Sequence, residues 1–120
     1  MPQSLVEDWI RYHAERRKQT DPLFEAWERV DELVRLDPEA GWNLTLELIE
    51  AAPDDHVLAN IAAGPLEDLL SRSADHFIDQ VELQARRDPK FRRCLTGVWG
   101  LPPAVRERLH KYTSTVTNPL

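Results

Sequence analysis

Three Asp-Pro pairs do most to limit how this chain can fold. They lie in "TDPLF" (20–24), "LDPEA" (36–40) and "RDPKF" (87–91). An Asp at the N-cap accepts hydrogen bonds from the free amides of a first helical turn, and a Pro in the next position has a preset φ and no amide to leave unpaired. Each pair therefore predicts that a helix begins there. The stretch "GLPPA" (100–104) predicts a further helix start.

Apolar residues between these starts recur at steps of three and four, which is the spacing of one helix face. Leu23, Trp27, Val30 and Val34 show it in one such segment. No segment alternates polar and apolar residues over a useful length, and the chain has no Asn-Gly or Asp-Gly hairpin turn. We therefore predict an all-α fold of seven or eight short helices. Because the links are short, neighbours should pack antiparallel as helical hairpins, with a hint of a helical-repeat layout.

The length of the chain, 120 residues, is that of one domain. We predict a single helical domain over residues 1–112. Residues 113–120 read "TSTVTNPL", which combines β-branched and polar residues without a helical pattern. We expect this tail to be frayed or disordered, as chain ends without packing partners are.

Nothing in the sequence predicts export or a membrane span. The segment "MPQSLVEDWI" carries acids where a signal peptide needs Lys or Arg, and the longest apolar run covers only residues 61–63. The single cysteine, Cys94, excludes an internal disulfide and any site with several thiolates. We therefore predict a cytoplasmic protein with no membrane partner.

Charge is distributed unevenly along the chain, whose formal net charge is −6. Residues 1–20 carry +1, residues 21–85 carry −13 and residues 86–120 carry +6. The negative net charge of the chain argues against general nucleic-acid affinity, which depends on neutralising phosphates. The acidic middle favours a basic partner. The basic end either complements that middle internally or contacts an acidic protein or a phosphate.

The stretch "GPLE" interrupts an apolar helical run. We interpret it as a helix start with Gly64 at the N-cap, Pro65 at the first position and Glu67 at the third, where the carboxylate can reach back to the N-cap amide. The helix dipole also favours an acid there. A second interpretation places Glu67 against Arg92 or the next arginine. Such a pair would either fix the crossing of two helices or present an acid and a base at a groove.

Two blocks, "AAGPLEDLL" and "DPKFRRCLTGVW", make residues 20–100 resemble an uncharacterised bacterial family of small helical proteins. That family is marked by a Gly-Pro-Leu-Glu block, found here at residues 64–67, and by a Pro-x-Phe-Arg block, found here at residues 89–92. The resemblance implies a bacterial origin and a helical fold. It implies no activity, because none is assigned to the family.

Two short clusters combine aspartate and histidine, which are side chains that hold metal ions. In one, His76 and Asp79 lie about one helical turn apart, and the other covers residues 54–56. Neither matches a His-Glu-x-x-His or Glu-x-x-His pattern, so we interpret both as solvated surface. Cys94 lies on an apolar stripe and is interpreted as a core residue. With no glycine-rich phosphate loop and no Gly-x-Ser-x-Gly elbow, the sequence predicts no catalytic residue, metal ligand or cofactor, and an enzyme is disfavoured.

Acidic residues between positions 25 and 50 form the candidate partner surface. Trp42 is included because it follows Gly41 in a first helical turn, where it is either a core residue or partly exposed, and an exposed tryptophan suits a binding hot spot. The candidate surface comprises Glu25, Glu28, Asp31, Glu32, Trp42, Glu47 and Glu50.

Small size, acidity, helicity and the lack of a catalytic motif are features that adaptor, antitoxin and immunity proteins share. We therefore predict a module that binds one basic protein partner through the acidic helical surface, with charge steering the encounter. The alternative hypothesis, from another class, is a ligand-binding or enzymatic domain with a groove around Glu67 and Arg92.

Overall fold

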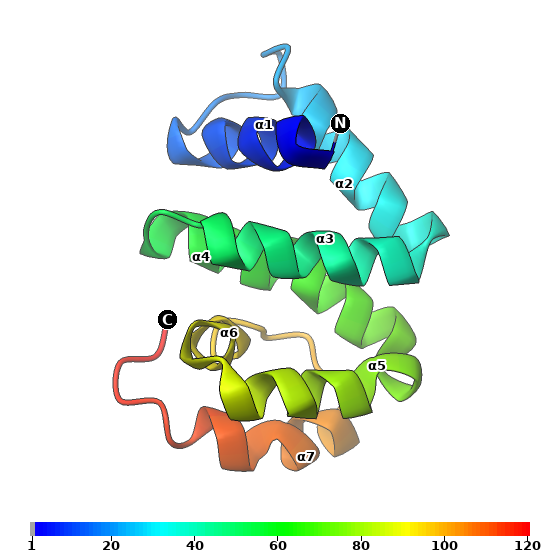
Figure 1. The fold of residues 1–120 in the computed structure, drawn as a ribbon, viewed down its shortest axis with the longest axis vertical. Helices are drawn as coiled ribbons and strands as arrows, with labels where there is room; N and C mark the ends of the chain where they lie inside the picture. Colours follow the sequence, from blue (N-terminus) through cyan, green and yellow to red (C-terminus); the bar gives the residue numbers. More distant parts are fainter. Residues whose placement is uncertain (1) are drawn as a thin grey trace.

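Helices make up the regular structure of the chain, as the sequence predicts (Figure 1). The computed structural model describes residues 2–120, with side chains described from residue 5 onward. Within this range there is no strand. In chain order the elements are α1 (Pro2–Ala14), α2 (Phe24–Leu36), α3 (Pro38–Ala51), α4 (Asp55–Ile61), the π-helical turn η1 (Ala62–Leu66), α5 (Glu67–Arg87), α6 (Pro89–Leu95) and α7 (Pro103–Thr113).

Proline-led caps begin α3, α6 and α7 where the sequence predicts them. The Asp37 side chain accepts a hydrogen bond from Ala40 N at 3.3 Å, with Pro38 in the first position of α3. The Asp88 side chain accepts from Lys90 N and Phe91 N at 3.0 and 3.1 Å and caps α6 in the same way. These carboxylates satisfy amides that have no partner inside the helix, so local sequence alone defines these boundaries.

The first Asp-Pro pair lies in a turn ahead of its helix, so the predicted start was slightly early. The Asp21 carboxylate accepts a hydrogen bond from Leu23 N at 2.8 Å, and the Asp21 carbonyl accepts one from Phe24 N at 2.9 Å. An aspartate that bonds two residues ahead forms a local turn rather than a helix cap. The regular α-helix α2 therefore begins at Phe24.

Gly64-Pro65 does not interrupt the helix, and the prediction of a new start there was wrong. Helix α4, the turn η1 and helix α5 follow one another without a break from residue 55 to residue 87. Pro65 has no amide to donate, and the chain widens into one π-helical turn, after which Glu67 N donates to the carbonyls of Ala62 and Gly64. Counted as continuous bodies, the described helices number six, slightly fewer than predicted.

A kink at Ser73 gives α5 two directions (Figure 1). Its backbone, with φ −135° and ψ 29°, leaves the helical region. The first half of α5 continues the line of α4, and the second half lies with α6 and α7 at the far end of the molecule (Figure 1). Helices α1 and α2 occupy the opposite end, with α3 and α4 between.

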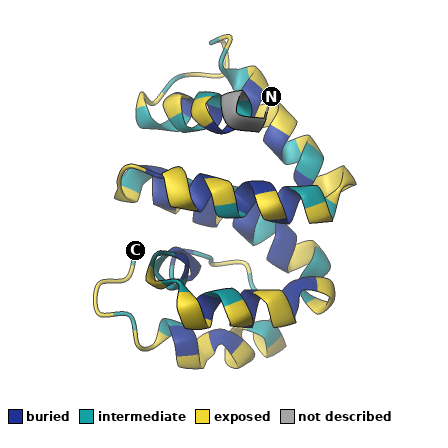
Figure 2. Ribbon diagram, viewed as in Figure 1, coloured by how far each residue is buried: buried dark blue, intermediate teal, exposed yellow. Residues whose placement is uncertain are grey.

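The hydrophobic core includes residues from all of these helices, and each helix carries buried residues (Figure 2). At its centre the Trp42 ring stacks on Phe77 with centroids 5.7 Å apart and meets the edge of Phe91 at 5.8 Å. Trp9 from α1 and Leu109 from α7 are each 1% exposed, so both ends of the molecule share this core. Large aromatic side chains bury the most apolar area per residue, so each member of this cluster contributes strongly to packing.

The chain end lies along α6. Arg93 Nε donates to the carbonyl of Asn118 at 2.7 Å, and Leu120 N donates to Thr96 Oγ1 at 2.9 Å. These contacts join the tail to the domain that precedes it, and the predicted fraying of residues 113–120 stays a prediction. Among the described helices none is both long enough and apolar enough to cross a membrane.

Candidate functional site

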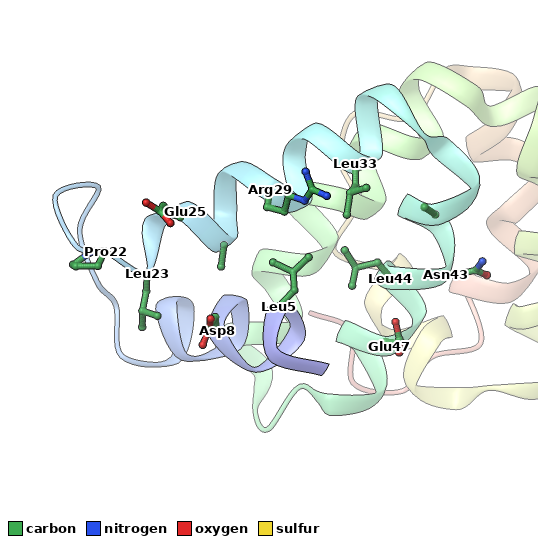
Figure 3. A pocket seen from close by; sticks show the side chains of 12 residues that line it. Leu5, Asp8, Pro22, Leu23, Glu25, Arg29, Leu33, Asn43, Leu44 and Glu47 are labelled. Carbon is green, nitrogen blue, oxygen red and sulfur yellow. The ribbon is translucent and has the colours of Figure 1, made fainter. Parts of the chain in front are cut away.

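A groove lies between α1, α2 and α3 and has a volume of about 810 Å³ (Figure 3). Seven of its twelve lining residues are apolar, and they come from all three helices and from the turn that precedes α2. These apolar residues are Leu5, Pro22, Leu23, Ala26, Leu33, Ala40 and Leu44.

The floor of this groove is an extension of the core. Leu5, Leu33 and Leu44 come from α1, α2 and α3, and Figure 3 shows their side chains directed into the same space. Leu44 is buried, whereas Leu5 and Leu33 are partly exposed and pack against the core. An apolar surface that stays open to solvent in this way is a feature of binding grooves.

The rim of the groove is acidic. Asp8, Glu25 and Glu47 contribute three carboxylates from three helices, against the single cation of Arg29. Arg29 also donates from Nη1 to Glu32 Oε1 at 3.3 Å, so part of its charge is balanced from outside the groove. A cleft lined by one sign of charge concentrates its electric field and attracts groups of opposite charge.

The structure separates the members of the predicted partner surface into three groups. Glu25 and Glu47 line the groove, and Glu28 and Glu50 are exposed outside it. The other two α2 acids form ion pairs one turn apart on the same helix: Asp31 with Arg35 at 3.1 Å and Glu32 with Arg29 at 3.3 Å. Leu5 and Asp8 of α1 were missed, because sequence alone does not show that α1 covers this face.

Trp42 does not belong to a surface, and its place in the predicted partner surface was wrong. It is only 4% exposed. The reason lies one residue earlier, where α2 and α3 approach closely: a Cβ on Gly41 would lie 2.8 Å from Val34 Cα. This close approach brings the start of α3 against α2 and leaves Trp42 among Phe77 and Phe91.

The candidate pair Glu67 and Arg92 is not brought together. Glu67 Oε1 accepts hydrogen bonds from Trp99 N and Gly100 N, both at 3.1 Å. Arg92 Nη1 donates to the carbonyls of Ala85 and Arg86, at 2.7 and 3.3 Å. Glu67 therefore anchors the loop after α6, and Arg92 satisfies carbonyls at the end of α5. Nothing in this geometry supports an acid and a base that share a substrate.

The next arginine, Arg93, does pair with an acid on another helix. Both of its terminal nitrogens bind the Asp55 carboxylate, which joins α6 to the start of α4. These hydrogen bonds hold the pKa of Asp55 below its ordinary value, since they favour the charged form. The contact spans 38 residues, and no local sequence signal indicates it.

The aspartate and histidine clusters have other partners. His76 Nε2 lies 2.5 Å from Glu39 Oε1, Asp79 pairs with Arg108 at 2.8 Å, and Asp54 caps α4 by accepting from Val57 N at 2.9 Å. Among residues that the structure describes, no group of three or more His, Cys, Asp or Glu side chains could hold a metal ion.

Cys94 is fully buried, with its Sγ 3.6 Å from the carbonyl of Leu58. Burial raises the pKa of its thiol to about 12, because the apolar surroundings disfavour the thiolate. A thiol of this kind is a packing residue rather than a nucleophile.

The chain belongs to a protein family of unknown function, DUF6869, whose model matches residues 7–116. The match agrees with the predicted membership of an uncharacterised family, and it covers α2, α3 and most of α1, although Leu5 of the groove floor lies outside it. No curated protein and no solved structure matches the chain.

Proposed function

We propose that this protein is a binding module whose groove between α1, α2 and α3 takes a basic amphipathic helix from one protein partner. The observation that supports the proposal is the combination of an apolar floor, made by Leu5, Leu33 and Leu44, with an acidic rim, made by Asp8, Glu25 and Glu47. An amphipathic helix presents the complementary pattern, with apolar residues on one face and cations flanking them.

Charge complementarity favours a basic occupant over an acidic or neutral one. Residues 24–51, which form α2 and α3, carry eight acidic and two basic residues. Rim charges of this kind accelerate the encounter and select the partner, whereas the apolar anchors supply most of the affinity. We further propose that the protein acts in the bacterial cytoplasm as an adaptor, antitoxin or immunity-type protein, which its size, single thiol and lack of catalytic motifs support.

The proposal is tested by selecting binders from a display library of helix-forming peptides. We expect the selected sequences to combine Leu or Ile at steps of three and four with Lys or Arg beside them. The affinity of the strongest peptide is then measured by fluorescence anisotropy. It should weaken about tenfold in Glu25→Gln/Glu47→Gln, because two rim charges are lost. The matched control Glu28→Gln/Glu50→Gln removes the same charge from exposed positions outside the groove and should stay within about twofold.

The floor is tested separately with Leu33→Ser, which removes apolar surface from a partly exposed position. Peptide affinity should fall further than in the charge variant, while circular dichroism shows a folded protein. Selected peptides without basic residues, or an equal loss in the groove and control variants, would contradict the proposal. Binding at Glu67 and Arg92 has no support from geometry, because each is bonded elsewhere.

A further inference from the structure

A second groove lies toward the other end of the molecule, between the end of α5, helix α6, helix α7 and the tail. Its volume is about 690 Å³. Five cations line it, and among its described lining residues none is acidic. The cations are Arg86, Lys90, Arg92, Arg93 and Lys111.

Two of these cations are held in place without being neutralised. Lys90 Nζ donates to the carbonyls of Glu50 and Ala52, at 3.0 and 2.8 Å. Arg92 Nη1 donates to the carbonyl of Ala85 at 2.7 Å. Carbonyl oxygens are neutral, so each side chain is fixed in position and keeps its full charge. Fixed donors lose little further freedom when they bind a ligand.

Arg86 and Lys111 flank the ring of Tyr112. Arg86 Nε donates to the Tyr112 hydroxyl at 3.3 Å, and within the described residues its two terminal nitrogens have no partner. Lys111 Nζ lies 5.2 Å from the centre of the Tyr112 ring and 3.8 Å from Glu82 Oε2. Two of the five cations therefore have an acidic partner: Arg93 binds Asp55, and Lys111 lies at ion-pair distance from Glu82.

We propose that this groove binds a small anion that carries two or more phosphate groups, either an inorganic oligophosphate or a nucleoside polyphosphate. Arginine presents planar pairs of N–H donors that match phosphate oxygens, and lysine adds a point charge. The volume is in the range of small-molecule sites, and a cleft with only positive charge focuses the field on a compact anion.

A long nucleic acid is disfavoured by the rest of the chain. The five groove cations lie close together, whereas residues 21–85 carry a net charge of −13. A polyanion that extended beyond the groove would meet this acidic region and lose affinity by repulsion. A compact oligophosphate avoids it.

The test is isothermal titration of the full chain with tripolyphosphate, ATP and a single-stranded oligodeoxythymidylate, each at about 0.15 M salt. We expect saturable binding of tripolyphosphate or ATP with one site per chain. Tighter binding of tripolyphosphate indicates an inorganic ligand, and tighter binding of ATP indicates a nucleotide; both support the proposal. Tighter binding of the oligonucleotide than of either would overturn it, as would the absence of saturable binding in the millimolar range.

The variant Arg86→Gln/Lys111→Gln removes two groove cations while leaving the carbonyl-binding Lys90 and Arg92 in place. Its affinity should fall by about 10- to 100-fold, as expected when charge-assisted hydrogen bonds are lost. The matched control Arg72→Gln/Arg87→Gln removes two exposed cations that do not line the groove, and it should stay within about twofold of the wild type. An equal loss in both variants would contradict a localised site.

A measurement on the wild-type chain keeps the test valid if the groove variant unfolds. Amide chemical shifts are followed by NMR during the tripolyphosphate titration. Changes should concentrate at residues 85–93 and 111–118, which line the groove. Changes concentrated on α1 and α2 instead would overturn the proposal. Because the peptide-binding groove lies at the other end, either proposal can fail without the other.

Discussion

The two grooves use their charged residues in opposite ways. Around the first groove, Glu25 and Glu47 stand at the rim of an apolar floor that packs against the core. Around the second, Lys90 and Arg92 donate to backbone carbonyls of α3 and α5 and so help to join those helices to α6. The comparison teaches that a charged side chain can stand at a rim without joining helices, or can complete unsatisfied carbonyls of another helix while it keeps its charge.

The largest expected effect on stability comes from a substitution that disrupts the packing of the first region. Gly41→Ala places a methyl group 2.8 Å from Val34 Cα, which is backbone and cannot rotate away. Alanine ordinarily stabilises a helix by up to about 1 kcal/mol relative to glycine, but overpacking here should destabilise the protein by about 1–3 kcal/mol. Urea unfolding followed by circular dichroism measures the change.

Gly64→Ala is the matched control, because a Cβ there meets nothing within 4 Å. It should be neutral or stabilising by up to about 1 kcal/mol. If Gly41→Ala were equally harmless, the close contact between α2 and α3 would not be needed to hold the floor of the groove.

The second largest expected effect on stability comes from a substitution that removes hydrogen bonds between α5 and α7. Glu82 is 8% exposed on α5 and accepts from Arg108 Nε at 2.8 Å and from the Tyr112 hydroxyl at 3.2 Å, both on α7. Glu82→Ala should lower the free energy of unfolding by about 1–2 kcal/mol, because the buried Tyr112 hydroxyl loses its acceptor and Arg108 loses a partner. Asp79→Ala removes the exposed partner of the same arginine and should have little effect.

These hydrogen bonds from Arg108 hold the pKa of Glu82 below its ordinary value, with burial opposing them and Tyr112 adding to them. A carboxyl whose pKa is lowered by folding stabilises the protein above its unfolded pKa, and this contribution is lost as pH falls. Acid unfolding of the wild type should therefore show a Glu82-dependent loss of stability below about pH 4.5.

A third prediction concerns how the stability of the protein depends on pH through a histidine of the first region. His13 of α1 is half-buried, and its Nε2 has no hydrogen-bond partner among the described residues. Burial, and repulsion from His56, lower the pKa of His13 from 6.5 to about 4. Between these values the unfolded chain binds a proton that the folded chain does not, so stability should fall as pH decreases from 6.5 to 4.

Partial exposure reduces the size of this effect to about 1–2 kcal/mol. His13→Leu should flatten the pH dependence over that range, as measured by urea unfolding at several pH values. His110→Leu, at an exposed position on α7, is the control and should keep the slope of the wild type. An unchanged slope in His13→Leu would show that other groups cause the loss.

The smallest expected effect concerns the acidic rim itself. Glu25→Gln/Glu47→Gln should leave the unfolding midpoint nearly unchanged, because exposed carboxylates contribute little to stability. The same variant should lose peptide affinity. A large drop in thermal stability would mean that these acids serve the fold, and the contrast between the two grooves would disappear.

The sequence by itself determined those features that depend on neighbouring residues. Asp37 and Asp88 accept hydrogen bonds from amides two or three residues ahead, so the helix starts that they cap can be predicted from the sequence. Apolar residues at helical spacing likewise indicate an all-α fold, because the period of the pattern is the period of the element. The burial of Cys94 follows from its place on an apolar stripe.

Tertiary structure decided the features that join distant segments. The partners of Glu67 lie 32 and 33 residues away, and Arg93 binds Asp55 across 38 residues, so local patterns do not reveal either contact. Gly64-Pro65 has the signature of a helix start, yet the helix continues there through a partly buried π-helical turn. Both grooves have the same origin: they exist only because separate helices meet, and the packing of the whole chain determines which side chains line them.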